Sequence, residues 1–149
     1  MMSDLPESLE ERFSAALHGT ARTWRLAIDK RLKHLGIGQA GWMTIAMVAK
    51  SPEPMSQRAL ADLVGVEGPS MVSMLDRLER EGLVTRAPSP TDRRVKLVHL
   101  TAAGASLYEQ VRKEADAVRS ALFEGIAPQA LAAAADLLEV LRARIEAQL

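Results

Sequence analysis

Two short helices joined by a tight turn are the feature that most limits how this sequence can fold. Ser56 is a suitable N-cap for the first helix, because its hydroxyl can accept a hydrogen bond from a free backbone N–H of the first turn. Gly65 suits the end of that helix, since glycine tolerates a left-handed turn. Pro69 fits the first turn of the second helix, and Gly82 fits the position just past its end. The pattern predicts a helix-turn-helix, although such pairs also occur in all-α proteins that bind no nucleic acid.

A β-hairpin with a basic tip is predicted directly after this helix pair. The runs LVTRA (83–87) and VKLVHL (95–100) are rich in β-branched and aliphatic residues, and a turn containing Pro, Ser and Asp separates them. The 149-residue chain has 19 Lys plus Arg and 19 Asp plus Glu, so any affinity for phosphate must come from local clusters. The hairpin is such a cluster, with four cations against the single acid Asp92: Arg86, Arg93, Arg94 and Lys96.

Long amphipathic helices are predicted at both ends of the chain. Apolar residues recur at the spacing of one helix face from about Glu7 to Leu35, and a short helix follows around Trp42. Thr101 is expected to cap a fifth helix and Pro128 to open a sixth. The sixth helix carries an apolar seam of the kind found between packed helices, made of Leu131, Ala134, Leu138, Leu141 and Ile145.

The order helix, turn, helix, basic hairpin is that of a winged helix. The predicted fold class is therefore mainly α (α+β), with a winged helix-turn-helix lobe, a small β-hairpin wing and long terminal helices. These helices would interlock across a two-fold axis with a second copy, although an intramolecular bundle is the alternative. We predict one domain over residues 1–149, with dimerisation helices at 1–35 and 101–149 and the winged lobe at 39–100.

The second helix of the pair presents one face for packing and one for contact. Met71, Leu75 and Leu78 share a face, while Ser70, Ser73, Met74 and Arg77 share another. A helix fits the major groove of B-DNA, and an arginine on a thin hairpin can enter the minor groove. Asp92 could fix the aim of Arg94 by charge-assisted hydrogen bonds. The residues predicted to contact DNA are Ser56, Gln57, Pro69, Ser70, Ser73, Met74, Arg77, Arg86, Asp92, Arg93, Arg94 and Lys96.

Three stretches resemble the MarR-type winged-helix regulators, and within them the SlyA-like branch. They are RTWRLAIDKRLKHLGIGQAGW (22–42), VEGPSMVSMLDRLEREGLVTR (66–86) and DRRVKLVHLTAAG (92–104). The resemblance implies a homodimer that binds a pseudo-palindromic operator, with a recognition helix in the major groove and a wing arginine, here Arg94 with Asp92 behind it, in the minor groove. It places the recognition roles on Pro69, Ser70, Ser73 and Arg77. Ser73 and Met74 depart from the arginine and threonine of SlyA-like helices, so the resemblance does not extend to the target sequence or the affinity.

The resemblance also implies a small aromatic acid as an effector, bound between the dimerisation helices and the DNA-binding lobe. The cleft would be lined by Trp24, Arg25, His34 and Trp42. An arginine beside aromatic rings could hold a carboxylate. The alternative is that the two tryptophans are packing residues, because they lie at helical core spacing.

Several other functions are not expected. The chain has no cysteine, and its three histidines are far apart in the sequence without a paired ligand, so we expect no metal site and no cofactor. No nucleophile elbow, phosphate loop or metalloprotease motif occurs, so we expect no enzymatic activity. The N-terminus lacks the pattern of a signal peptide and no apolar run approaches the ~20 residues of a bilayer span, so we expect a soluble cytoplasmic protein without membrane contact.

Two function classes follow from these patterns. The first is a homodimeric, sequence-specific transcriptional regulator that reads an inverted-repeat operator and could be modulated by a small aromatic carboxylate. The alternative is a helical dimeric protein-interaction module that has lost DNA binding, which the departures at Ser73 and Met74 would permit. The expected cleft is the only feature that supports a third class, a pure ligand carrier.

Overall fold

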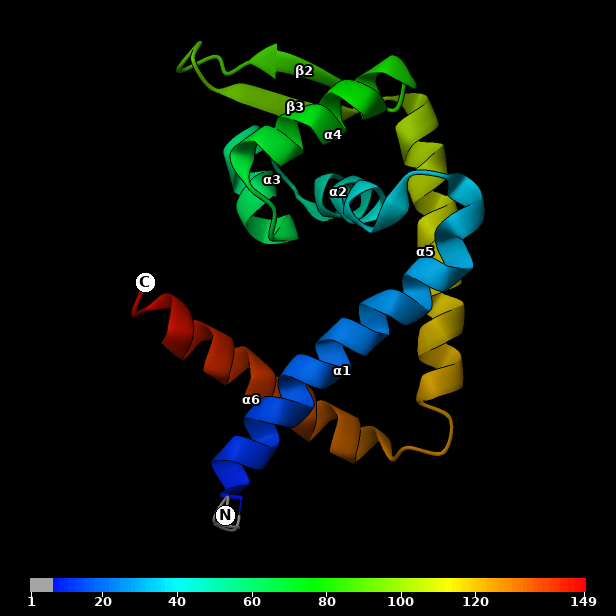
Figure 1. Ribbon diagram of the computed structural model, residues 1–149, viewed down its shortest axis with the longest axis vertical. Helices are drawn as coiled ribbons and strands as arrows, with labels where there is room; N and C mark the ends of the chain where they lie inside the picture. The colour runs from blue at the N-terminus through cyan, green and yellow to red at the C-terminus, as the bar shows by residue number, and fades with distance from the viewer. Residues whose placement is uncertain (1–6) are drawn as a thin grey trace, which may run out of the picture. The chain divides into compact units, whose positions relative to one another are not determined.

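The computed structural model describes residues 7–149 of the chain (Figure 1). It confirms the predicted fold class: the described chain is mostly helical, with a small three-stranded antiparallel sheet. Residues 1–6 of the expected dimerisation segment 1–35 lie outside the described residues. The elements in chain order are α1 (Leu9–Leu32), the 3-10 turn η1 (Lys33–Leu35), α2 (Gly38–Lys50), β1 (Met55–Ser56), α3 (Gln57–Val64), α4 (Gly68–Arg80), β2 (Val84–Pro88), β3 (Lys96–Leu100), α5 (Ala102–Leu122) and α6 (Pro128–Glu146).

The chain divides into two compact units, one up to Asp116 and one from Ala117 onward. The first contains the helix pair, the sheet, α1 and most of α5. The second contains the end of α5 and all of α6. Within residues 7–149, no helix is both long enough and apolar enough to cross a membrane.

The local signals of the helix-turn-helix are confirmed. The Ser56 hydroxyl accepts a hydrogen bond from the backbone N–H of Ala59 at 3.1 Å and so caps α3. Gly65 ends this helix with a φ of +80°, a left-handed conformation that glycine adopts without a steric penalty. Pro69 lies in the first turn of α4, and Gly82 follows this helix with a φ of +75°. The residue types at these four positions therefore determine where each of the two helices begins and ends.

The sheet contains the predicted hairpin and one strand that the sequence did not reveal. β2 pairs with β3 antiparallel, with Val84 opposite Leu100 and Pro88 opposite Lys96. β1 pairs with the other edge of β3, with Met55 opposite Val98. A strand of two residues is too short to show a period-2 pattern, which explains why it was missed.

The core of the first unit is built around α2. This helix contacts α1, α3, α4 and β3, and α4 in turn packs against β2 of the hairpin (Figure 1). The side chains that are completely shielded from solvent are Ile45, Leu60, Met71, Leu75, Leu78, Val98 and Thr44. The predicted packing face of α4, which consists of Met71, Leu75 and Leu78, is thereby confirmed.

α1 is tied to this core near its C-terminal end. It stops as an α-helix at Leu32, three residues before the predicted end at Leu35, and continues as η1. The Arg31 Nε atom lies 2.8 Å from the Glu114 Oε2 atom of α5. The hydrogen bond from Arg31 lowers the pKa of Glu114 below its ordinary value. These contacts hold one end of α1 against α2 and α5.

α6 begins at Pro128 as predicted, and none of its residues is buried within the chain. Five of its large apolar side chains are exposed, from 38% for Leu131 to 57% for Ile145, and Leu141 is half-buried. A helix with such a stripe ordinarily buries it against another element.

We expect Gly104→Ala to destabilise the fold strongly. A Cβ atom at Gly104 would lie 2.0 Å from the backbone oxygen of Leu83. The contact is between backbone segments, so it can be relieved only by moving β2 and α5 apart, which destabilises the fold. The free energy of unfolding, measured by urea denaturation, should fall by about 2–3 kcal/mol. Gly19→Ala is the matched control, because a Cβ there meets nothing within 4 Å and alanine favours the interior of α1. Equal stabilities of the two variants would contradict this close approach.

Candidate nucleic-acid interface

The four α4 residues predicted to share the DNA-facing side differ in how far the fold exposes them. Met74 and Arg77, predicted to face DNA, are half-buried. The Arg77 guanidinium donates to the backbone oxygen of Gly36 at the end of η1, and its Nε atom lies 3.4 Å from Glu81 Oε1. The Met74 sulfur lies 3.6 Å from the position that a Cβ would take on Gly41 of α2. α4 thus packs along a flank as well as along its buried face, with Met74 against α2 and Arg77 against the α1–α2 connection.

The outward side of α4 is offset from the predicted one. Pro69, Ser70 and Ser73 are exposed as expected, and Val72 and Arg80 are exposed as well. Pro69, Ser73 and Arg80 lie almost directly opposite the buried stripe of the helix. Arg80 could have been predicted from a helical wheel centred on Met71, Leu75 and Leu78, because it lies opposite that stripe. Val72 lies about a quarter turn from the stripe, so its exposure follows from the packing of α4 and not from the wheel.

Arg86 is also placed differently from the prediction. It was expected to contact DNA, yet its side chain is only 17% exposed and binds the protein itself. Its Nη2 atom lies 2.5 Å from Asp76 Oδ1 and 2.6 Å from Glu79 Oε2, and its Nη1 atom donates to Gln57 Oε1 at 3.1 Å. Gln57, another predicted DNA contact, is thereby engaged through its carbonyl oxygen. We call these four residues the Arg86 network.

The Arg86 network joins three elements of the winged lobe. Arg86 comes from β2, Asp76 and Glu79 from α4, and Gln57 from the first turn of α3. Burial opposes the charged form of Arg86, but hydrogen bonds to Glu79 and Asp76 outweigh it and raise the pKa of Arg86 above its ordinary value. The network fixes β2 against α4 and neutralises two acids that lie beside the exposed side of that helix.

The tip of the hairpin carries the arrangement predicted for a wing. Arg94 is 91% exposed, and its Nε and Nη2 atoms donate to the two carboxylate oxygens of Asp92 at 3.1 and 3.2 Å. Asp92 also accepts from the backbone N–H of Arg94 at 3.1 Å. The side-chain hydrogen bond from Arg94 lowers the pKa of Asp92, so this carboxylate stays ionised at neutral pH. The predicted pairing of Asp92 with Arg94 is confirmed.

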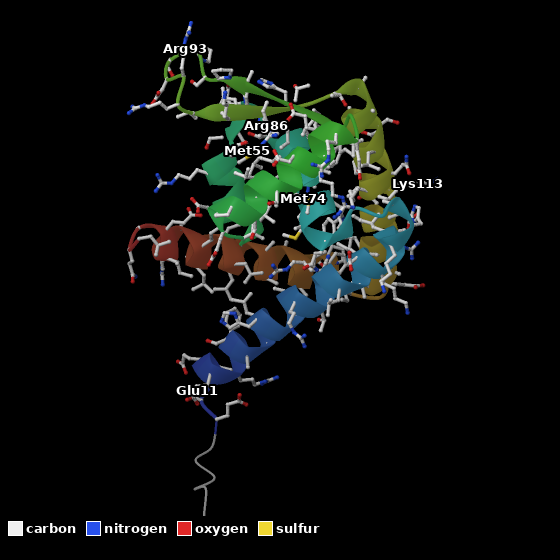
Figure 2. All side chains as sticks on the ribbon, turned by 45° about the horizontal axis from the view of Figure 1, so that its top comes forward. Glu11, Met55, Met74, Arg86, Arg93 and Lys113 are labelled. Atoms are coloured by element: carbon white, nitrogen blue, oxygen red, sulfur yellow. The ribbon has the colours of Figure 1, made fainter. Side chains whose placement is uncertain are left out.

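Further cations surround this pair. Figure 2 shows Arg93 at the tip of the hairpin and Arg86 beneath it against α4. Arg93 and Lys96 are exposed, as is Arg58 in the first turn of α3, a cation outside the predicted set of DNA contacts. Lys96 shares a surface hollow with Glu79 and Arg86. α3, α4 and the hairpin thus present cations and small polar side chains that suit a phosphate backbone and the edges of bases.

The four residues expected to bind an effector differ in their burial and in their hydrogen-bond partners. Trp42 is buried, and its indole N–H donates to Asp29 Oδ1 at 3.2 Å, which favours the packing alternative for this residue. Trp24 is half-buried, while Arg25 and His34 are exposed. The Arg25 Nε atom donates to the backbone oxygen of Ala21, and His34 Nδ1 lies 3.0 Å from the backbone oxygen of Arg31. Among residues 7–149, no three His, Asp or Glu side chains form a cluster that could hold a metal ion.

A helix-turn-helix followed by a basic hairpin that pairs in a small sheet defines a winged-helix protein. The sequence profile of the MarR family matches residues 35–95. The structure is similar to that of the transcriptional regulator PA3341, with 37% identity over 90% of this chain and 98% of that one and a TM-score of 0.83. The chain belongs to the MarR family of transcriptional regulators.

Two further structures mark the range of the similarity. CouR from Rhodococcus jostii RHA1, solved with bound p-coumaroyl-CoA, is 26% identical, with coverage of 91% of this chain and 95% of that one and a TM-score of 0.76. The transcriptional regulator SlyA is 19% identical, with coverage of 89% and 93% and a TM-score of 0.75. The likeness to SlyA therefore extends to the fold, and the SlyA-like branch rests on the sequence motifs alone.

Proposed function

We propose that this protein is a homodimeric, sequence-specific DNA-binding regulator of transcription. Each subunit would place the exposed side of α4 in the major groove and Arg94 in the neighbouring minor groove of an inverted-repeat operator. The observation that carries the proposal is the wing tip, where a 91% exposed arginine is held by both oxygens of Asp92. Such a group is oriented before binding and reaches into a narrow groove whose negative potential attracts it. With no expected catalytic group, the protein would act by binding, in the cytoplasm.

The proposed dimer is supported by the apolar side chains that the single chain leaves exposed. On α6, Leu131, Leu138 and Ile145 are 38%, 41% and 57% exposed and share one side of the helix. In the first half of α1, Leu9 is 73% exposed. Association of two copies through these helices would cover such surfaces and would give the two-fold symmetry that an inverted repeat requires.

An aromatic carboxylate or a related acyl compound remains our proposed effector class. The support is the family's implied cleft near Trp24, Arg25 and His34, together with the aromatic acyl ligand named for CouR. The SlyA-like assignment is likewise proposed, on the wing motif that contains Asp92, Arg93 and Arg94. Calorimetry with aromatic carboxylates, with and without bound operator, would test the effector and its coupling to DNA release.

The function is tested by selecting duplexes from a random-sequence library and from sheared genomic DNA on the purified full chain. We expect an enriched inverted repeat with half-sites about 10 base pairs apart, whose affinity falls steeply between two salt concentrations. Failure to enrich any duplex, with binding that does not respond to salt, would favour the protein-interaction alternative.

Arg94→Ala should weaken binding to the selected duplex about 10-fold, because the minor-groove contact and its charge are lost from both half-sites. The slope of log affinity against log salt should also become shallower. Lys50→Ala, at an exposed position at the end of α2 and outside both the wing and the proposed dimerisation helices, serves as the matched control. If the Arg94→Ala protein bound the duplex as tightly as the wild type, the proposed minor-groove contact of Arg94 would be wrong.

A further inference from the structure

The first two turns of α4 lack charged side chains. Between Glu67 and Asp76 the sequence reads GPSMVSML, so neither arginine nor lysine projects from this stretch. Guanine is most often recognised in the major groove by a bidentate arginine or lysine on its O6 and N7 atoms. Recognition of bases by this part of α4 must therefore use a different chemistry.

The apolar side chains exposed in these turns are Pro69 and Val72, and Val72 is 40% exposed. Val72 borders a surface hollow that Gln57 and Arg58 of α3 also line. It therefore lies on the side of α4 that faces the start of α3, where the exposed Arg58 is suited to a phosphate. A duplex that contacts Arg58 and the outward side of α4 would therefore come close to Val72.

The charges around the same hollow favour a base edge rather than the backbone as the neighbour of Val72. Asp62 and Glu67 line the hollow, and their carboxylates repel phosphates, so Arg58 is the one described residue lining it that attracts the backbone. A β-branched side chain in a helix has one preferred χ1 rotamer, so Val72 is held in place before binding. The apolar group that a base presents in the major groove is the C5-methyl of thymine.

We infer that Val72 is a specificity-determining residue that contacts the C5-methyl group of a thymine in each half-site. The inference rests on the proposed function and extends it to the composition of the operator. The neighbouring Ser73 hydroxyl can donate or accept and so fits more than one base, which leaves the methyl contact as the more selective of the two.

The test replaces each thymine of a selected duplex, one at a time, by uracil, which keeps every hydrogen-bonding group and lacks only the methyl. For the wild-type protein we expect one thymine per half-site whose replacement weakens binding about 3- to 5-fold, as the loss of one buried methyl contact predicts. For Val72→Ala the thymine and uracil duplexes should bind equally at that position. Val72→Thr, which keeps the shape but removes one methyl, should show an intermediate difference. Affinities are measured by fluorescence anisotropy, and thermal melting checks that each variant is folded.

Ser73→Ala is the matched control, and it should keep the full thymine-to-uracil difference. If no uracil position matters, or if Val72→Ala shows the same difference as the wild type, the inference is overturned while the proposed function stands. If no duplex is selected at all, both the proposed function and this inference are wrong. The two failures are therefore distinguishable.

Discussion

Leu138→Glu should convert the protein to a monomer and reduce its affinity for the selected inverted repeat about 100-fold or more. Leu138 is 41% exposed in the single chain and lies on α6 between Leu131 and Ile145, on the same side of the helix. A carboxylate in the middle of this stripe would be desolvated on association, which opposes dimer formation. A monomer engages one half-site at a time and loses the gain of about 10²- to 10⁴-fold that two linked sites provide. Sedimentation and anisotropy titrations on the same samples measure the two effects.

The control for this variant is Ala132→Glu, which adds the same charge to the same helix on the side opposite the apolar stripe. It should leave the oligomeric state and the operator affinity unchanged. Circular dichroism distinguishes loss of α6 from loss of the dimer, because the helical content of Leu138→Glu should stay close to that of the wild type. A Leu138→Glu protein that remained dimeric and bound the operator fully would show that α6 does not hold the subunits together.

Most of the fold could be predicted because short-range chemistry sets the ends of its elements. Ser56, Gly65 and Gly82 each act through a cap or a left-handed turn that the residue type itself favours. The hairpin follows from two runs of strand-forming residues around a polar turn, and the Asp92–Arg94 pair follows from a spacing of two residues within that turn. Each of these signals lies within a few residues of its effect.

The candidate site was less predictable because long-range contacts decide which side chains are free. Arg77 is drawn to the backbone oxygen of Gly36, 41 residues away in the chain, and Arg86 is held by Asp76 and Glu79. The sequence shows that these two residues are cations, but it does not show which groups they bind. The packing of α2 against α4 likewise leaves Met74 half-buried, whereas Val72 is exposed. The sequence thus identified the elements of the candidate interface but not which side chains of α4 the fold leaves most exposed.

Arg86→Met should weaken operator binding about 100-fold even though, in the structure, the guanidinium binds acidic side chains of the protein itself. The substitution keeps a long apolar side chain but leaves Asp76 and Glu79 unpaired beside the phosphates, in addition to loosening β2 from α4. Because Arg86 is largely buried while both acids remain partly exposed, we expect the free energy of unfolding to fall by only about 1–2 kcal/mol. Urea denaturation and anisotropy titrations measure the two losses separately.

Neutralising the two acids distinguishes a positioning role for Arg86 from a direct contact with DNA. In a protein that combines Arg86→Met with Asp76→Asn and Glu79→Gln, the repulsion of phosphates is removed, so much of the lost affinity should return. Arg112→Met is the matched control, because its partner Glu109 lies 3.9 Å away in an exposed pair on α5 that contributes little to stability. If the combined variant is folded but regains no affinity, Arg86 contacts the operator itself, as its position in a basic hairpin first suggested. Recovery would instead mean that the acids of α4 are tolerated at a DNA interface only because β2 supplies their counter-charge.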